Sequence, residues 1–418
     1  MNSRERVMAA LNHEQPDRPA IDFGGHRSSG IMAVTYAKLK DALGIKTGHV
    51  YIYDMIQQLA IVEPEVLDAL NVDTVELGRA FMLAEGDWQD WILPDGTPCK
   101  IPGFIKIENV EGDQYLLAED GTRLGVQVKD GFFFEQCHYP MGDRDFENDP
   151  FDDIAEQFAY TQWTGIAAPG NHFPLDEAGL QRLTAGAKRL RESTDRAIIG
   201  LFGGNLFEIP QYLIGMEKYL LYMGLYPEAI KRFSEKLTNL HLANLEKWLG
   251  AVGPYIDIVL FGDDLGTQTG PFMSTSMYQE YFKPYHSKLW HRAKEIADVK
   301  VQLHCCGGVE PLLNDLIDAG LDAINPVQIS CQGMDSQLLK DNYSQRLVLW
   351  GGGCDTREIL PLGKPEDVAK HVKGQLDILN PGGGFVFQQV HNILAGVPVE
   401  NILAMFDAVV PINWPNKK

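Results

Sequence analysis

The sequence predicts an α/β fold, a TIM (β/α)8 barrel, from two observations. First, short runs rich in β-branched and aromatic residues recur along the 418 residues, and most are followed by an amphipathic helical pattern. Second, these runs are continuously apolar rather than alternating, which is typical of parallel strands that are buried on both faces. Eight strand–helix units in one chain are typical of this barrel, so we expect a single TIM-barrel domain over residues 1–418.

The eight predicted strands lie in order along the chain. Helical patterns separate most of them, for example residues 310–321 and residues 365–380, in which apolar positions recur every three or four residues. The predicted strands are residues 19–23, 72–77, 197–202, 256–261, 299–304, 322–325, 347–351 and 385–389.

One segment interrupts this alternation after the second predicted strand. Residues 88–137 alternate apolar and polar positions and contain Asp-Gly and Glu-Gly-Asp turns, which is the pattern of antiparallel hairpins. We therefore predict a β-hairpin insertion over residues 88–137, followed by a helical stretch over about residues 149–193. The sequence leaves open whether the insertion covers the barrel mouth, contacts a partner protein or forms a dimer interface.

Composition and charge exclude several kinds of partner. Lys and Arg total 36 and Asp and Glu total 57, which gives a net charge of −21, so we expect neither nucleic-acid binding nor binding to anionic membranes. No apolar run reaches the roughly 18 residues that a membrane helix needs, and the N-terminal segment lacks the apolar core of a secretory signal. These features predict a cytoplasmic protein. Its six sparse cysteines favour metal binding or catalysis over a disulfide framework.

Polar side chains follow the predicted strands at the points where the strands end. The carboxyl ends of the strands meet on one face of a TIM barrel and form its active site, so this clustering indicates an enzyme. The stretch GGNLFE (203–208) follows the third strand. The candidate residues at the other strand ends are His26, Arg27, Glu76, Asp263, Asp264, His304, Cys306, Asn325, Gln328, Cys354, Gln389 and His391.

A histidine and two cysteines indicate a metal site. Residues i and i+2 of a strand face the same side, so His304 and Cys306 can point into one site while Cys305 points away. Cys354 follows a strand two positions further round the same rim. This donor set suits Zn²⁺, and three protein ligands leave a fourth position open, as in catalytic zinc sites. The alternative is that these cysteines are small buried side chains, which is common for a free cysteine.

Two acidic residues and a histidine have several interpretations. One of Asp263 and Asp264 can cap the next helix, while the other binds substrate or takes part in acid–base chemistry. His391 can be a proton donor, a substrate ligand or a residue that packs a loop.

The first two strand ends also leave alternatives open. His26 and Arg27 are an anion-binding pair at the barrel mouth or part of a solvated loop. Glu76 is a surface carboxylate or a ligand of substrate or metal.

Several motifs resemble the uroporphyrinogen decarboxylase superfamily. They are RERVMAALNHEQPDRPAID, GDDLGTQTGPFMS, YQEYFKPYHSKLW, HCCGGVEPLLNDLIDAGLDAINPVQ, WGGGCDT and FVFQQVHNI with VPVENI. Together they cover nearly the whole chain apart from the insertion. The resemblance implies a TIM barrel and two alternative chemistries.

One branch of the superfamily decarboxylates uroporphyrinogen without a metal and uses paired arginines in the loop after the first strand, where this chain has the single Arg27. The other branch comprises zinc-dependent, corrinoid-linked methyltransferases, which carry His-x-Cys after the fifth strand and a further cysteine. His304 and Cys306 match that pattern. The coenzyme M methyltransferases have the further cysteine in the last barrel loop, where this chain has QQVHNIL, so Cys354 would replace it from one loop earlier.

The resemblance therefore implies a catalytic barrel that holds Zn²⁺ through His304, Cys306 and Cys354. It would move a methyl group between a small O-methyl, N-methyl or thiol substrate and the corrinoid (cobalamin) of a partner protein, and demethylation of a methoxylated compound is the expected direction. Asp263, Gln328 and His391 would orient the substrate or manage a proton. The residues expected to bind substrate are His26, Arg27, Glu76, Asp264, Asn325 and Gln389.

Two other functions stay open. One is a metal-free lyase that acts on a tetrapyrrole carboxylate, and the other is a non-catalytic barrel that binds a small molecule. A homodimer is compatible with the sequence, which does not specify the oligomeric state.

Overall fold

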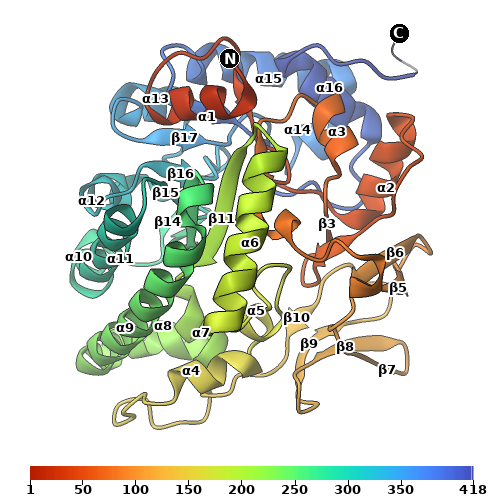
Figure 1. The fold of residues 1–418 in the computed structure, drawn as a ribbon. Coiled ribbons are helices and arrows are strands. Elements are labelled where there is room, and N and C mark those ends of the chain that lie inside the picture. Colours follow the sequence, from red (N-terminus) through yellow and green to blue (C-terminus); the bar gives the residue numbers. More distant parts are fainter. Residues whose placement is uncertain (416, 418) are drawn as a thin grey trace.

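A sheet of eight parallel strands forms the centre of the protein (Figure 1). The computed structural model describes residues 1–415 and residue 417. In the order in which they hydrogen-bond, the strands are β1 (Ala20–Ile21), β18 (Phe385–Phe387), β17 (Val348–Trp350), β16 (Ala323–Asn325), β15 (Lys300–His304), β12 (Ile258–Gly262), β11 (Ala197–Gly203) and β4 (Thr74–Glu76). Each strand overlaps one of the predicted strands, so the predicted α/β TIM barrel is confirmed.

The side chain of Asp73 joins the two edge strands, β1 and β4. The backbone N–H of Asp73 donates to the carbonyl of Ile21 at 2.8 Å, and the Asp73 carboxylate accepts the N–H of Ile21 at 2.9 Å. Arg6 and Arg18 each donate to the same buried carboxylate at 2.7 Å. The carboxylate thus pairs a backbone donor that would otherwise be buried without a partner where the barrel closes.

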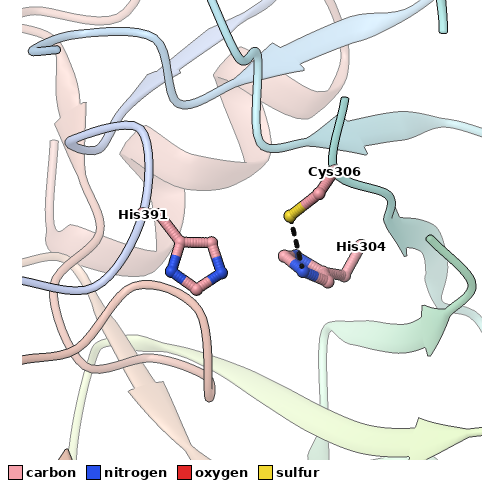
Figure 2. A group of neighbouring side chains, drawn as sticks. All are labelled: His304, Cys306 and His391. Carbon is pink, nitrogen blue, oxygen red and sulfur yellow. Dashed lines mark hydrogen bonds between the residues drawn. The ribbon is translucent and has the colours of Figure 1, made fainter. Parts of the chain in front are cut away.

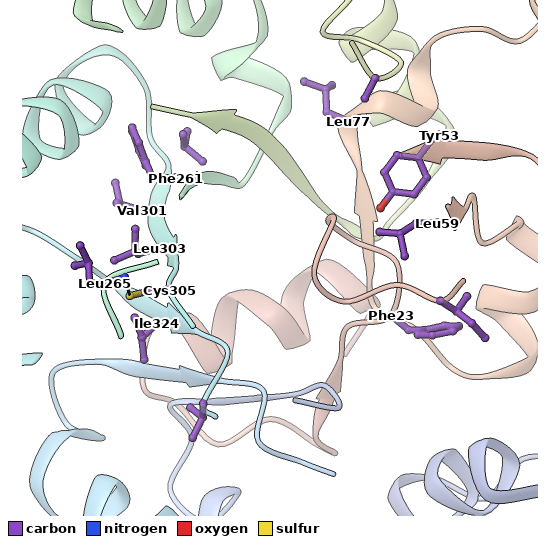
Figure 3. Close-up of a cluster of buried hydrophobic side chains, with 14 of the residues drawn as sticks. Phe23, Tyr53, Leu59, Leu77, Phe261, Leu265, Val301, Leu303, Cys305 and Ile324 are labelled. Atoms are coloured by element: carbon purple, nitrogen blue, oxygen red, sulfur yellow. Dashed lines mark hydrogen bonds between the residues drawn. The ribbon is translucent and has the colours of Figure 1, made fainter. Parts of the chain in front are cut away.

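Alternate residues of the strands point into the barrel and pack with α1. This inner cluster contains Ile199, Ile258, Leu260 and Trp350 from the strands, and Val7 from α1 lies among them. The intervening strand residues point outward to the helices. Figure 3 shows part of this outer hydrophobic layer, including Phe261, Val301 and Leu303. Because apolar side chains fill the inside of the barrel next to α1, the polar residues that follow the strand ends lie at the opposite rim.

The helices surround the sheet (Figure 1). They are α1 (Ser3–Leu11), α2 (Ala33–Ala42), α3 (Pro64–Ala69), α4 (Ile154–Gln157), α5 (Gln162–Gly165), α6 (Glu177–Ser193), α7 (Glu208–Ile214), α8 (Met216–Leu225), α9 (Pro227–Val252), α10 (Thr275–Tyr281), α11 (Lys283–Ile296), α12 (Leu313–Asp318), α13 (Ser336–Tyr343), α14 (Ile359–Leu362), α15 (Pro365–Leu379) and α16 (Val399–Val409). Helix α9 illustrates the pattern, since its buried Ile230, Phe233, Leu237 and Trp248 recur on one face. None of the described helices combines the length and apolar composition that a bilayer crossing requires.

The predicted insertion is present and antiparallel. It contains the hairpin of β5 (Trp88–Ile92) with β6 (Pro98–Pro102), and a four-stranded sheet. The strands of that sheet are β7 (Ile107–Val110), β8 (Asp113–Leu117), β9 (Arg123–Gln127) and β10 (Glu135–Gln136). Glu111 and Gly112 connect β7 to β8, and both have positive φ (53° and 103°), as a two-residue hairpin turn requires.

The helical stretch predicted over about residues 149–193 is only partly helical. Helices α4, α5 and α6 fall within it, but residues 166–176 are irregular. Pro169 and Pro174 interrupt this segment because proline lacks the N–H that a continuous helix needs. Two small hairpins were not predicted: β2 (Ile52–Asp54) with β3 (Leu59–Ala60), and β13 (Gly266–Thr267) with β14 (Gly270–Pro271).

Candidate metal centre and its cavity

Three side chains from two strand ends form a cluster of metal-binding type. His304 ends β15, Cys306 follows two residues later, and His391 lies in the loop after β18. One nitrogen or sulfur atom from each lies within 4.8 Å of the others (Figure 2). The His304 Nε2 and Cys306 Sγ atoms are 3.4 Å apart, and the two imidazole rings are tilted by 62°.

These distances suit a tetrahedral zinc ion. Zn–S bonds of about 2.3 Å and Zn–N bonds of about 2.0–2.1 Å place a nitrogen and a sulfur ligand about 3.5 Å apart. The observed separation of 3.4 Å between His304 Nε2 and Cys306 Sγ agrees with that geometry. A third donor from His391 leaves the fourth position open, so the donor set fits a zinc ion that also binds a substrate atom.

A chain of two side-chain amides fixes the orientation of His304. His304 Nδ1 lies 2.9 Å from Asn325 Oδ1, the Asn325 amide donates to Gln388 Oε1 at 2.7 Å, and the Gln388 amide donates to the carbonyl of Ser28 at 2.9 Å. A carbonyl oxygen can only accept, so Gln388 must turn its nitrogen to Ser28 and its oxygen to Asn325. The carbonyl of Trp350 accepts from the same Asn325 nitrogen at 3.5 Å, which supports this arrangement.

It follows that Nδ1 of His304 carries the proton in the neutral ring. Among the residues that the structure describes, its only partner is the oxygen of Asn325, which accepts. The other nitrogen, Nε2, then presents a lone pair toward Cys306, and the Ser28 hydroxyl lies 3.2 Å from it. Metal-binding histidines are held in this way by a hydrogen bond to the nitrogen that does not bind metal.

Burial also prepares the cluster for a cation. It lowers the pKa of His391 to about 3 and lowers the pKa of His304, so both imidazoles are neutral at pH 7. Burial and the neighbouring Asp264 carboxylate raise the pKa of the Cys306 thiol well above its usual range. Asp264 accepts the N–H of Cys306 at 2.7 Å and lies 3.6 Å from His304 Nε2. A bound metal must therefore displace a proton from Cys306.

Cys354, which the sequence indicated as the third ligand, does not belong to this cluster. Its backbone pairs with Gln389, and its fully buried side chain packs in the hydrophobic layer outside the sheet. The nearest polar partner of its sulfur is the Asp355 carbonyl at 3.8 Å. The pairing with Gln389 continues the sheet beyond β17 and turns the Cys354 side chain away from the cluster. His391, expected to act on substrate, occupies the third position instead.

His26 and Arg27 form no free anion-binding pair. His26 is fully buried, with Nε2 at 3.1 Å from Asp22 Oδ2, and Nδ1 accepts the N–H of Ser28. Arg27 lines the cavity described below, but its Nε lies 3.0 Å from the buried Asp54 carboxylate on β2. Both cationic candidates therefore have acidic partners within the protein.

Glu76 is neither a surface carboxylate nor a ligand of the cluster. It is buried at the end of β4 and faces a separate small pocket with Tyr53 and Arg79. Burial raises its pKa to about 7, against the opposing effect of Arg27 and Arg79. The main cavity does not include this side chain.

Asp263 holds the loop after β11 in place. Its fully buried carboxylate accepts the backbone N–H groups of Leu206, Phe207 and Glu208 at 2.8–2.9 Å, and His286 Nε2 lies 2.9 Å away. The predicted cap of the next helix is not found, since Ser274 caps α10. Asp263 instead accepts the N–H groups at the start of α7, which follows the neighbouring strand β11.

The three predicted site residues with side-chain amides form hydrogen bonds to other groups of the protein. Asn325 belongs to the chain that orients His304. Gln328 accepts the N–H of Gly307 at 2.7 Å and lines a second cavity beside Cys306. The buried Gln389 donates to the carbonyl of Ser29 at 3.0 Å.

The cluster opens on a cavity of about 530 Å³ at the carboxyl rim of the barrel. His304, His391 and Asp264 lie on its wall. The irregular segment 166–176 and helix α5 complete it, and α5 is held against the insertion by a hydrogen bond from Gln162 to the Phe134 carbonyl (2.7 Å). Its aromatic lining consists of Phe158, Trp163, Phe173, Phe202, Tyr212, Trp248 and Phe261. Such a size and lining are typical of a site for a small molecule.

Glu208 is an acidic residue of the cavity wall to which no sequence pattern assigned a role. It ends the GGNLFE stretch, lies on the cavity wall and is bound by Asn205 and Tyr212. Its place after the third strand was a signal, but only the fold shows that the side chain faces the cavity rather than solvent.

The fold and the cluster together define a TIM-barrel protein with its site at the carboxyl rim. The sequence model of the uroporphyrinogen decarboxylase (URO-D) family matches residues 170–411, which is more than half of the chain, so the chain belongs to this family. Among solved structures, a methyltransferase from Methanosarcina mazei is similar in fold, with a TM-score of 0.55, 15% sequence identity and 98% of each chain covered. No curated protein sequence matches the chain. The predicted family is confirmed.

Proposed function

We propose that this protein is a zinc-dependent methyltransferase that transfers a methyl group between a small substrate and the corrinoid of a partner protein. The observation that carries the proposal is the cluster of His304, Cys306 and His391, whose two histidines lie on the wall of a cavity of about 530 Å³. Membership of the family supports an enzyme of this superfamily, and the likeness to a methyltransferase is compatible with that branch.

His304, Cys306 and His391 would hold the zinc ion. Bound there, zinc supplies a Lewis acid that polarises the heteroatom carrying the methyl group. The chain itself provides the rest of the site: the amides of Asn325 and Gln388 orient His304, and the aromatic wall excludes water from the substrate.

The corrinoid would reach this site on a separate carrier protein. A cavity of about 530 Å³ has the size of a small-molecule site, whereas a corrinoid is much larger. The small substrate would therefore occupy the cavity, and the corrinoid would approach from the barrel mouth. In the demethylation direction, the methyl group would pass from the substrate to the corrinoid.

A lyase that acts on a tetrapyrrole carboxylate fits the cavity less well. Arg27 is the only Lys or Arg among the described lining residues, and it already lies beside Asp54. The carboxyl groups of Glu208 and Asp264 on the same wall offer a polycarboxylate no positive partner. The charge of the cavity therefore disfavours a substrate with several negative charges.

The first test is the zinc content of the purified, metal-replete protein. We expect about one zinc per chain in wild type and in Cys354→Ser, and loss of zinc from Cys306→Ser and His391→Ala. Wild-type protein should then form methylcobalamin from cob(I)alamin and a methyl donor, and Cys306→Ser should not. Metal-replete wild-type protein without zinc would contradict the proposal.

A further inference from the structure

Glu208 lies on the wall of the main cavity without a positively charged partner. The side-chain amide of Asn205 donates to its Oε2 at 2.6 Å, and the hydroxyl of Tyr212 donates to its Oε1 at 2.6 Å. Each oxygen thus accepts a hydrogen bond, which is the arrangement that suits a carboxylate. Arg27 is the only Lys or Arg among the described lining residues, and it lies beside Asp54 instead.

The neighbouring groups do not compensate a negative charge on Glu208. Burial raises its pKa to about 8, and the carboxylates of Asp264 and Asp263 add to this effect. His241, whose Nε2 lies 3.4 Å from the Asn205 carbonyl, is neutral at pH 7 because burial lowers its pKa to about 4. The hydrogen bonds therefore suit a carboxylate, but its burial without a cation is unfavourable. A positively charged ligand would complete this site and lower the pKa of Glu208.

Aromatic side chains extend from Glu208 along the cavity wall. The ring of Tyr212, which binds the carboxyl group, stacks on Trp163 with the centroids 5.9 Å apart. Phe158 stacks on His241 at 6.2 Å, and all four rings line the same cavity. The faces of aromatic rings attract cations, and cages of such rings bind quaternary ammonium groups. Because a quaternary ammonium needs no hydrogen-bond acceptor, one carboxylate and a set of aromatic faces are sufficient to bind it.

The end of β12 connects Glu208 to the metal centre. Gly262 on β12 pairs with His304 on β15. A Cβ atom at Gly262 would lie 2.4 Å from Nδ2 of Asn205, the same nitrogen that donates to Glu208. The missing side chain thus lets the Asn205 amide lie against the strand neighbour of His304. Since Glu208 and His304 face one cavity of about 530 Å³, a single small molecule can contact both.

We propose that Glu208 and the aromatic rings beside it bind a quaternary ammonium group of the substrate, while the metal centre receives a different atom of the same molecule, the heteroatom that carries the methyl group. A quaternary nitrogen has no lone pair, so it cannot be the atom that binds the metal. The substrate therefore has two functional groups, and the ammonium group orients the other one. As a statement about the substrate, this inference rests on the proposed function, whereas the cation site itself does not.

The first test measures binding and needs no reaction. Choline is compared with 3,3-dimethylbutan-1-ol, which has the same shape and the same hydroxyl group but a carbon atom in place of the charged nitrogen. Calorimetry gives the affinity of each compound for zinc-loaded wild type, for Glu208→Gln and for the exposed control Glu217→Gln. We expect wild type and Glu217→Gln to bind choline about 30-fold more tightly than the neutral alcohol, and Glu208→Gln to bind the two about equally.

A second variant tests the aromatic wall independently of the carboxyl group. Trp163→Leu keeps an apolar side chain but removes the aromatic face, so it should weaken the binding of choline about tenfold and that of the neutral alcohol much less. Wild-type protein that binds choline no more tightly than the alcohol would overturn the proposal. A preference for choline that survives in both Glu208→Gln and Trp163→Leu would overturn it as well.

Methyl transfer then separates this inference from the proposed function. Zinc-loaded protein is given cob(I)alamin with O-methylcholine or with its neutral analogue 1-methoxy-3,3-dimethylbutane, and methylcobalamin is measured. We expect Glu208→Gln to raise the KM of O-methylcholine about 30-fold, with little change in kcat or in the KM of the analogue. Choline binding that depends on Glu208, without transfer from either ether, would contradict the proposed function and support the cation site. Transfer from both ethers with equal KM in wild type would support the proposed function and overturn the cation site.

Discussion

Gln388 and His304 are joined through the side chain of Asn325, at 2.7 Å on one side and 2.9 Å on the other. The carbonyl of Ser28 anchors the far end of this chain. Since every group in it has a fixed donor or acceptor role, the backbone of the loop after β1 determines which nitrogen of His304 presents a lone pair toward Cys306. Gln388 is thus a positioning residue, although it lies in none of the positions that the sequence indicated.

Replacement of Gln388 by Glu should weaken zinc binding. A carboxylate cannot donate to the Ser28 carbonyl, so the orientation of Asn325 and the proton position on His304 are no longer enforced. We expect zinc affinity, measured by competition with a chelator, to fall about 10- to 100-fold. Nitrogen-15 NMR of the zinc-free protein should show the Nδ1-protonated ring of His304 in wild type and a mixture of tautomers in Gln388→Glu. Identical tautomers in the two proteins would contradict the assigned role.

Zinc affinity should rise with pH, because each zinc ion that binds displaces one proton from the protein. Burial and Asp264 raise the pKa of Cys306, so its thiol is protonated between pH 7 and 8.5, while burial keeps His304 and His391 neutral there. Each zinc ion bound should release one proton, and the apparent affinity should increase about tenfold per pH unit. Calorimetry in buffers of different ionisation enthalpy measures the number of protons released per zinc ion bound. A value of two would indicate a second thiol among the ligands, and a value of zero would exclude Cys306.

The strands could be predicted because their signal is local. A parallel strand buried on both faces is continuously apolar, and this is visible in a few residues such as 256–261. Strands β2 and β3 are as short as β1, but they pair antiparallel and lie outside the alternation of strands and helices that identified the barrel strands. The sequence therefore predicted the barrel and the insertion but not the small hairpin that supplies Asp54 to Arg27.

The ligand set could be predicted only in part. His304 and Cys306 leave a regular strand, where the alternation of side chains indicates that both face one way. Cys354 and His391 lie in loops, where direction depends on pairing with distant segments. The bridge between Cys354 and Gln389 turns the cysteine outward, and no local pattern encodes that bridge. On donor chemistry alone, the thiolate of a second cysteine was expected as the third metal ligand, rather than the imidazole of a second histidine.

Asp263 should contribute to stability rather than to catalysis. Its replacement by Ala would leave the N–H groups of residues 206–208 and the ring of His286 without their buried acceptor. We expect a loss of about 3 kcal/mol and a decrease in the thermal-unfolding midpoint of about 3 °C. Asp335→Ala, which removes a single exposed cap at Leu338, is the matched control and should cost about 1 kcal/mol. Unchanged stability of Asp263→Ala with loss of activity would instead favour a direct role in the reaction.

Cobalt substitution should count the thiolates directly. Each cysteine bound to Co²⁺ adds absorption from charge transfer between sulfur and metal, so a centre of His304, Cys306 and His391 should show the intensity of one thiolate. Cys354→Ser should have the same spectrum as wild type, because its side chain packs outside the sheet. His391→Cys should keep the metal and about double the band, which calibrates the intensity of two thiolates. It should also demethylate substrates more slowly, since a second thiolate donates charge to the metal and weakens it as a Lewis acid. A wild-type band as intense as that of His391→Cys, lost in part in Cys354→Ser, would return Cys354 to the ligand set and remove His391 from it.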